Sequence, residues 1–400
     1  WRRRWIYWRL LGNRSCPVLL AFLLAAFLLM HPSAVARNAD GTLGTIVTPN
    51  NGVPALVLPG AAFEAILSAE AALELVSAEG TVALQTQSAA IPGNRFRVQC
   101  TVPETAAPGA YALRANGSQP DETPRAVWVL DKVREYYVVA HVSDTHIGYD
   151  LDHPGQAEET LTAILAAINA SDAHFVTITG DLTHNGDEDQ FRRFLAVLDT
   201  CTLPTFVCVG NHDRTGTNYE RFFGPLWHTF TFGPDGYLVF DTKDFCTAND
   251  LGEQDGALER LRRDIKPCRY SIGIAHRYEP EMGMRAQIAL FVDNPLDMLL
   301  FGHWHRENTA NEQGVPWGAT RISVAPAGFE GAYRLLDMTA RGFIPREVQH
   351  VEVKIKEAPK PEPPAAEPPK QEPPKKESAK TKTQKNDSSK KKSPSKSKKK

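Results

Sequence analysis

The sequence predicts an α/β protein with an N-terminal all-β region and a disordered C-terminal tail. From Tyr136 onward, short runs of β-branched and aromatic residues alternate with amphipathic helical patterns, which is typical of a sheet with covering helices. Residues 38–135 instead hold short strand-like runs bounded by Gly, Pro and Asn. From about Val353 the chain is mostly Pro, Lys, Glu and Ser, which cannot bury enough apolar surface to fold. We therefore expect four segments: 1–36, 37–135, 136–350 and 351–400.

Residues 1–36 are typical of a secretory signal peptide. They contain five arginines and no acidic residue, an apolar run over residues 17–30, and the small-residue site Ala34-Val35-Ala36. A membrane-spanning helix needs roughly 17–25 residues, and this run is shorter. We expect cleavage, export to the periplasm, envelope or exterior, and no stable membrane span afterwards. A permanent anchor is the alternative.

Residues 37–135 are expected to form a β-sandwich. Strand-like runs occur at residues 55–58, 81–84, 95–102, 110–114 and 126–130. Residues 61–76, rich in Ala, Glu and Leu, fit a helix or two strands, and the choice stays open. Residues 108–114 resemble a late strand of an immunoglobulin-like sandwich entered through a turn. The expected region is therefore immunoglobulin-like.

Strand and helix patterns alternate through residues 136–350. Strands are predicted at 136–142, 174–179, 204–209, 237–240, 270–275, 297–301, 321–325 and 331–337, and helices at 160–168, 191–198 and 258–265. The five cysteines beyond residue 36 include no CxxC pair, so a thiolate zinc site is not expected.

Charge is distributed unevenly along the chain. Residues 351–400 hold 16 Lys and 7 acidic residues, although the formal charge of the whole chain is only −2. Without both ends the chain keeps 24 basic and 40 acidic residues, so its body is strongly acidic. Such a body is a poor general binder of nucleic acid, but it can house bound cations. The Lys-rich tail would attract a polyanion or the cell envelope, or serve as a solvated linker.

Polar side chains follow five of the predicted strands. They occur in Ser143-Asp144-Thr145-His146, Gly180-Asp181, Gly210-Asn211-His212-Asp213, His276 and Gly302-His303-Trp304-His305. Sites assemble at the carboxyl ends of strands in open α/β sheets. Glycine before Asp181, Asn211 and His303 would allow tight turns there. Imidazole, carboxylate and amide groups together suit a pair of divalent ions, which the same ligands accept as Mn, Fe or Zn.

These five motifs, in this order and at these spacings, resemble the motif set of calcineurin-like metallophosphoesterases. The resemblance covers roughly residues 136–345 and implies a four-layer α+β fold in which two mixed β-sheets are flanked by helices. It also implies that Asp144, His146 and His305 bind one metal, that Asn211, His276 and His303 bind a second, and that Asp181 bridges both.

The resemblance implies two catalytic side chains beside the metals. His212 would stabilise or protonate the leaving oxygen, and Asp213 would orient His212 through a hydrogen bond, with a helix or turn cap as its alternative role. After Asp181 the chain reads Leu-Thr-His184 where many family members carry a small acidic or polar stretch. His184, Tyr149, His153 and Tyr278 are weaker candidates for the rim of the site.

The predicted function is hydrolysis of phosphate mono- or diesters by an exported enzyme, through attack of a metal-bridging hydroxide. Two alternatives stay open: a nuclease steered by the tail, and an envelope or polyanion-binding surface protein with a vestigial phosphoesterase domain. The complete ligand set favours the enzyme.

Overall fold

The computed structural model describes residues 40–242, 257–277, 289–306 and 320–353. The predicted signal peptide, the tail beyond residue 353, Cys246 and Tyr278 lie outside these residues. Among the described helices, none combines the length and the apolar character that a membrane span requires.

Two β-sheets make up the N-terminal region. One sheet has the order β1-β3-β7-β6 and the other the order β2-β9-β8-β4-β5. The strands are β1 (Ile46–Thr48), β2 (Ala55–Val57), β3 (Ala62–Leu67), β4 (Ala71–Ser77), β5 (Gly80–Ala83), β6 (Gln85–Ile91), β7 (Arg95–Thr101), β8 (Gly109–Gly117) and β9 (Asp121–Val129). Its core includes Phe63, Leu75, Val98 and Leu113. The likeness of this region to immunoglobulin domains stays a prediction.

The stretch at residues 61–76 forms two strands, β3 and β4, and no helix. In β3 the side chains of Phe63, Ala65 and Leu67 are buried, whereas Ala62 and Glu64 are exposed. This two-residue alternation matches one buried face of a sheet. The Ala and Glu content therefore gave the weaker signal, because tertiary burial overrides helix propensity here.

Polar contacts fix the N-terminal region against strand β12 (Thr205–Cys208). The guanidinium of Arg125 donates to the carbonyls of Leu198 and Leu203. The backbone N–H of Val207 donates to the carbonyl of Gly52 at 2.9 Å. The N-terminal region therefore lies along this edge strand, and the Arg125 contacts reach residues that precede it.

Two mixed sheets contain most of the strands in the rest of the described residues, as the α/β alternation predicts. The first has the order β12-β11-β10-β18-β19, with β20 paired to β18, and the second the order β13-β14-β15-β16-β17. The first contains β10 (Tyr137–Val142), β11 (Phe175–Thr179), β18 (Ala332–Thr339), β19 (Gly342–Pro345) and β20 (Gln349–His350). The second contains β13 (His228–Phe232), β14 (Asp235–Val239), β15 (Ser271–Ile274), β16 (Met298–Phe301) and β17 (Arg321–Val324).

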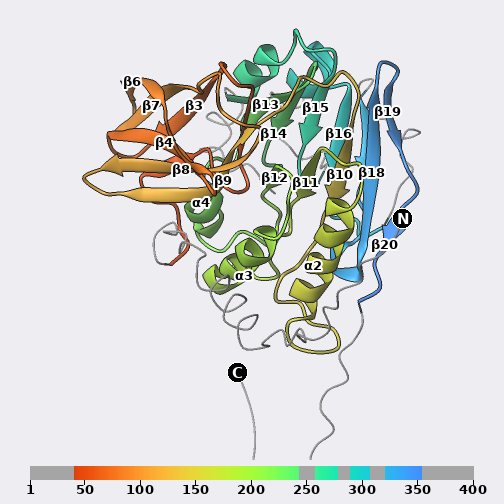
Figure 1. Cartoon of the computed structure of the whole chain (residues 1–400). Helices are drawn as coiled ribbons and strands as arrows, with labels where there is room; N and C mark the ends of the chain where they lie inside the picture. Colours follow the sequence, from red (N-terminus) through yellow and green to blue (C-terminus); the bar gives the residue numbers. More distant parts are fainter. Residues whose placement is uncertain (1–39, 243–256, 278–288, 307–319, 354–400) are drawn as a thin grey trace, which may run out of the picture. The chain divides into compact units, whose positions relative to one another are not determined.

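Helices cover the outer faces of both sheets. Helices α2 (Gln156–Asn169), α3 (Glu188–Leu198) and α4 (Asn218–Phe223) pack on the first sheet through a core that includes Leu161, Phe191 and Phe223. Figure 1 shows α2 and α3 in front of β12, β11, β10 and β18. A helix containing residues 257–264 packs on the second sheet through Leu258. The two sheets and the helices on their outer faces thus form four layers, as the resemblance implied.

A largely aromatic core joins the two sheets. Phe175 and Phe206 of the first sheet meet Tyr237 of the second, together with Phe230 and Phe232 of β13. Within each sheet the central strands are parallel: β10 with β11 and β12, and β14 with β15, β16 and β17. Their carboxyl ends therefore fall at one edge of each sheet, where the predicted ligands begin.

Candidate metal centre

The predicted ligands lie in two groups that share one carboxylate. Ligand atoms of Asp144, His146, Asp181 and His305 all lie within 4.8 Å of one another, and so do those of Asp181, His276 and His303. Asn211 joins the second group, because its Oδ1 atom lies 3.0 Å from Nε2 of His276. The structure thus brings all seven predicted ligands together at the ends of β10, β11, β12, β15 and β16.

The first group is assembled around Asp144 and Asp181. Nε2 of His305 lies 3.2 Å from Oδ1 of Asp144, and 3.4 Å from Nε2 of His146. Nε2 of His146 lies 3.7 Å from Oδ2 of Asp181. Two imidazole nitrogens and two carboxylates therefore converge, which is a donor set that suits a divalent ion.

The backbone at the ligands adopts an uncommon conformation. Among the described residues other than glycine, seven have positive φ, and five of these are predicted ligands: Asp144, His146, Asp181, His303 and His305. Positive φ is uncommon in residues other than glycine, and each such conformation costs of order 1–3 kcal/mol. The conformation turns these side chains toward the shared centre.

The glycines that precede three ligands are needed for different reasons. Gly180 has φ of +80°, a left-handed conformation that glycine adopts without penalty. At Gly210 and Gly302, φ is not in this region. A Cβ atom at Gly302 would overlap Ser143 and Asp144, and one at Gly210 would overlap Asp181. The predicted tight turn therefore holds for Gly180 alone, and the other two allow close backbone approach.

The close packing of charged groups and their burial shift the pKa values of several predicted ligands. Burial opposes ionisation of Asp181, but His276 and the N–H of His212 outweigh it and hold the pKa of Asp181 below its usual range. Burial also favours neutral His276, yet the neighbouring Asp181 carboxylate raises the pKa of His276 to about 9. Burial lowers the pKa of His146 and of His303 to about 4.

The donor set fits divalent ions on this structural evidence. The ligand side chains Asp144, His146, Asp181 and His276 are buried, and Oδ1 of Asp144 makes no well-oriented hydrogen bond within the protein. A buried polar atom without such a partner is costly unless another group satisfies it. Asp144, His146 and His305 would hold one ion, Asn211, His276 and His303 a second, and Asp181 both.

His212 lies beside the first group and outside the predicted ligand set, although its ligand atom lies within 4.8 Å of those of His146 and His184. Its ring centre is 4.7 Å from that of His146. Its Nδ1 atom lies 2.7 Å from the carbonyl oxygen of His184. Because a carbonyl only accepts, Nδ1 carries the proton of this bond, and Nε2 is left for chemistry.

Asp213 does not orient His212, contrary to that prediction. Its fully buried carboxylate accepts four hydrogen bonds, from the backbone N–H groups of Gly210, Leu182 and Thr183 and from the Thr183 hydroxyl. These bonds use the acceptor positions of both oxygens. Asp213 therefore ties the loops after β11 and β12 together, which is the capping role that was its alternative.

The weaker rim candidates differ in whether they lie near the metal ligands. The rings of Tyr149 and His184 lie 6.3 and 5.6 Å from that of His146. His153 instead pairs with Glu159 of α2 at 3.0 Å. Phe329, which we did not predict, lies 5.5 Å from His146 and 5.2 Å from His305, ring to ring. No pattern in the sequence marks it, because it arrives with a short 3-10 helix, η2 (Gly328–Glu330), before β18.

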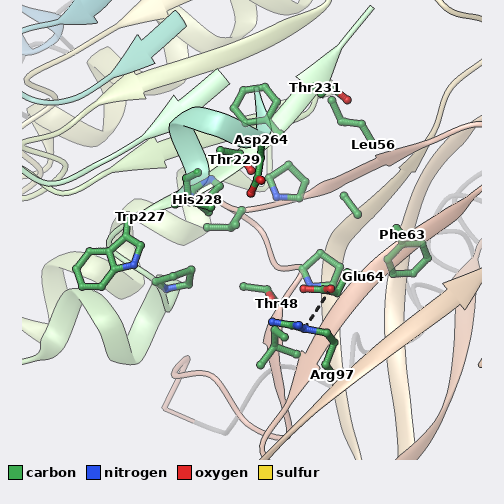
Figure 2. A pocket seen from close by; sticks show the side chains of 18 of the residues that line it. Thr48, Leu56, Phe63, Glu64, Arg97, Trp227, His228, Thr229, Thr231 and Asp264 are labelled. Atoms are coloured by element: carbon green, nitrogen blue, oxygen red, sulfur yellow. Dashed lines mark ion pairs between the residues drawn. The ribbon is translucent and has the colours of Figure 1, made fainter. Parts of the chain in front are cut away.

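A separate cleft of about 990 Å³ opens between the N-terminal strands and β13. Figure 2 shows Phe63, Glu64, Arg97, Trp227 and His228 around it, with an ion pair between Arg97 and Glu64. Among the described residues that line it, none is a predicted ligand. This cleft is therefore not the candidate metal centre.

Comparisons with known proteins agree with this geometry. The sequence profile of a family described as calcineurin-like phosphoesterase matches residues 137–307. A protein from Rhodopseudomonas palustris, named probable cyclic nucleotide phosphodiesterase, is 26% identical over 213 residues, which cover 47% of this chain and 75% of that protein. A protein of the same name from Coxiella burnetii is 25% identical and covers 47% of this chain and 82% of that protein.

Among solved structures, the purple acid phosphatase from yellow lupin seeds aligns with a TM-score of 0.45 and 14% identity, covering 70% of this chain and 68% of that one. The family match spans the five motifs up to His305, and the ligands that it implies converge in the structure. Residues 137–307 thus match the calcineurin-like phosphoesterase family, and the chain is a metal-dependent phosphoester hydrolase whose converging ligands suit a binuclear divalent metal centre.

Proposed function

We propose that this protein is an exported phosphodiesterase, and that cyclic nucleotides are among the substrates to test first. One observation carries the proposal: two ligand groups share Asp181, and His212 stands beside them without belonging to either. The choice of a diester is supported by the names of the two relatives, both probable cyclic nucleotide phosphodiesterases.

Two divalent ions, when bound, would activate water at neutral pH and polarise the phosphoryl oxygens. The ligand side chains hold the reaction centre in place, and the burial of Asp144, His146, Asp181 and His276 limits access of bulk water to it. Asp181 contributes to both groups, so it sets their separation. These residues therefore supply positioning, which is a large part of catalysis in phosphoryl transfer.

His212 handles the proton of the leaving group. The bond from Nδ1 to the His184 carbonyl fixes the ring orientation and leaves Nε2 on the other side. A positioned acid of this kind contributes typically 10²–10⁴-fold to the rate. Asp213 acts indirectly, since it holds the loop that carries Asn211 and His212.

The test is metal content and ester preference in the same sample. The full chain would be loaded with Mn²⁺, its bound metal counted, and turnover of bis-p-nitrophenyl phosphate, p-nitrophenyl phosphate and a 3′,5′-cyclic nucleotide compared. We expect about two ions per chain and faster turnover of the diesters. A folded, loaded chain that hydrolyses only the monoester would refute the diesterase proposal, and one that hydrolyses none would refute the function altogether.

Export is part of the proposal and rests on residues 1–36 alone. The measurement is the N-terminal sequence of the mature protein, recovered separately from cytoplasm, periplasm and medium. Cleavage after Ala36 in an extracytoplasmic fraction is expected. Uncleaved protein in the cytoplasm would contradict it.

A further inference from the structure

Three ring-bearing side chains surround the first ligand group. The rings of Tyr149, His184 and Phe329 lie 6.3, 5.6 and 5.5 Å from the ring of His146. They come from the loop after β10, the loop after β11 and η2. None of them belongs to the seven-residue ligand set. We refer to these three side chains as the aromatic rim.

The rings of the aromatic rim meet as two walls of a corner. Tyr149 and His184 are stacked, with ring centres 4.8 Å apart and an angle of 26°. Phe329 stands nearly perpendicular to Tyr149, at 85° and 5.6 Å. Planar groups favour these two geometries, offset stacking and edge-to-face contact. Because His184 is also stacked on His212, at 5.3 Å and 24°, a third ring would contact the corner through Tyr149 and Phe329.

Backbone hydrogen bonds hold this arrangement in place. His184 N–H donates to the carbonyl of Ile147, and Tyr149 N–H to that of His146, at 3.0 and 2.8 Å. Phe329 N–H donates to the carbonyl of Asp144 at 2.9 Å. The rim is thus anchored to the ligand-bearing segments themselves. A rim fixed in this way loses little conformational freedom when a ligand binds.

The outer part of the rim is apolar and open to solvent. Tyr149 of the rim is 38% exposed, and Leu151, on the same loop but outside the rim, is 53% exposed. Exposed apolar side chains beside a polar cluster gain free energy when a ligand covers them. A phosphate at the metals would bring its directly attached organic group to these side chains.

We propose that the aromatic rim receives an aromatic or heteroaromatic ring of the phosphate ester and so determines substrate preference. The proposal rests on the phosphodiesterase function above. It deepens that function by naming the chemical class of the organic group. Stacking of a ring on an aromatic side chain is worth about tenfold or more in affinity.

The test is calorimetric binding of two ligands that cannot be hydrolysed, phenylphosphonate and methylphosphonate, to the Mn²⁺-loaded full chain. We expect the wild-type protein to favour phenylphosphonate by about tenfold. Tyr149→Ala and Phe329→Leu should each lose most of this preference. The matched control is Tyr136→Ala, because Tyr136 is 56% exposed and precedes β10, at the end of the strand away from the site. It should keep the full preference.

Two results would overturn the inference: equal affinity for both phosphonates in the wild-type chain, or a preference that survives both rim substitutions. A hydrolysis assay distinguishes failure of this inference from failure of the proposed function. Phenyl p-nitrophenyl phosphate and methyl p-nitrophenyl phosphate share one leaving group and differ only in the retained group. If neither is hydrolysed while phenylphosphonate is still preferred, the diesterase function fails and the ring-binding rim stands.

Discussion

The Oδ2 atom of Asp181 lies 3.2 Å from the Nε2 atom of His276, although the two residues follow strands of different sheets. Asp181 comes after β11 in the first sheet and His276 after β15 in the second. The same oxygen lies 3.7 Å from Nε2 of His146. Asp181 is therefore the residue through which the two halves of the metal centre are joined.

Replacing Asp181 should empty both halves of the centre together. In Asp181→Asn the shared negative charge is lost, and an amide is a weaker ligand for either ion than a carboxylate. We expect well under one ion per chain by elemental analysis and loss of nearly all turnover. Asp189→Asn is the control, since Asp189 is an exposed carboxylate of α3. Retention of one full ion in Asp181→Asn would show that the residue serves a single site.

Metal binding should release protons near neutral pH. Asp181 raises the pKa of His276 to about 9, so the ion-free imidazole is protonated at pH 7, whereas an ion binds its neutral form. Apparent affinity should therefore increase with pH, by up to about tenfold per unit for this proton, until pH reaches about 9. Titration of Mn²⁺ by calorimetry at pH 7, in two buffers of different ionisation enthalpy, measures the release. Identical heats in both buffers would contradict it.

Replacing His212 should lower the rate of hydrolysis without changing the number of bound metal ions. It lies 4.7 Å from His146, ring to ring, yet neither ligand group requires it. In His212→Ala we expect about two bound ions and a rate lower by 10²–10⁴-fold. Esters with a good leaving group, such as p-nitrophenolate, should lose less than alkyl esters, because they need less protonation. Loss of metal with normal specific activity of the loaded fraction would assign His212 to the ligand set instead.

The sequence predicted which side chains meet within each sheet. Parallel strands end at a common edge, so Asp144, Asp181 and Asn211 could be expected to lie together, and likewise His276 and His303. That the two edges coincide depends on the packing of Phe175 and Tyr237 between the sheets, which no local pattern reports. The resemblance to a known family supplied that step.

Other features of the site depend on tertiary contacts that leave no local signal. Left-handed φ at Asp144 or His305 is imposed by the surrounding structure. Phe329 reaches His146 because β18 pairs antiparallel with β10 and brings η2 to the end of that strand. In the N-terminal region β6 escaped prediction, since its residues 85–91 are mostly polar and exposed.

Asp213 should act on stability, in contrast to its neighbour His212. Removing its carboxylate in Asp213→Ala leaves the backbone N–H groups of Gly210, Leu182 and Thr183 without their acceptor. Each buried unsatisfied donor costs about 1–3 kcal/mol, so the free energy of unfolding should fall by several kcal/mol in all. Denaturant unfolding of the ion-free proteins measures this directly, and Asp189→Ala should change it by less than about 0.5 kcal/mol, as expected at an exposed site. If Asp213→Ala unfolds like the wild type but loses rate as His212→Ala does, Asp213 supports His212 after all, and the hydrogen bonds to the loops contribute little.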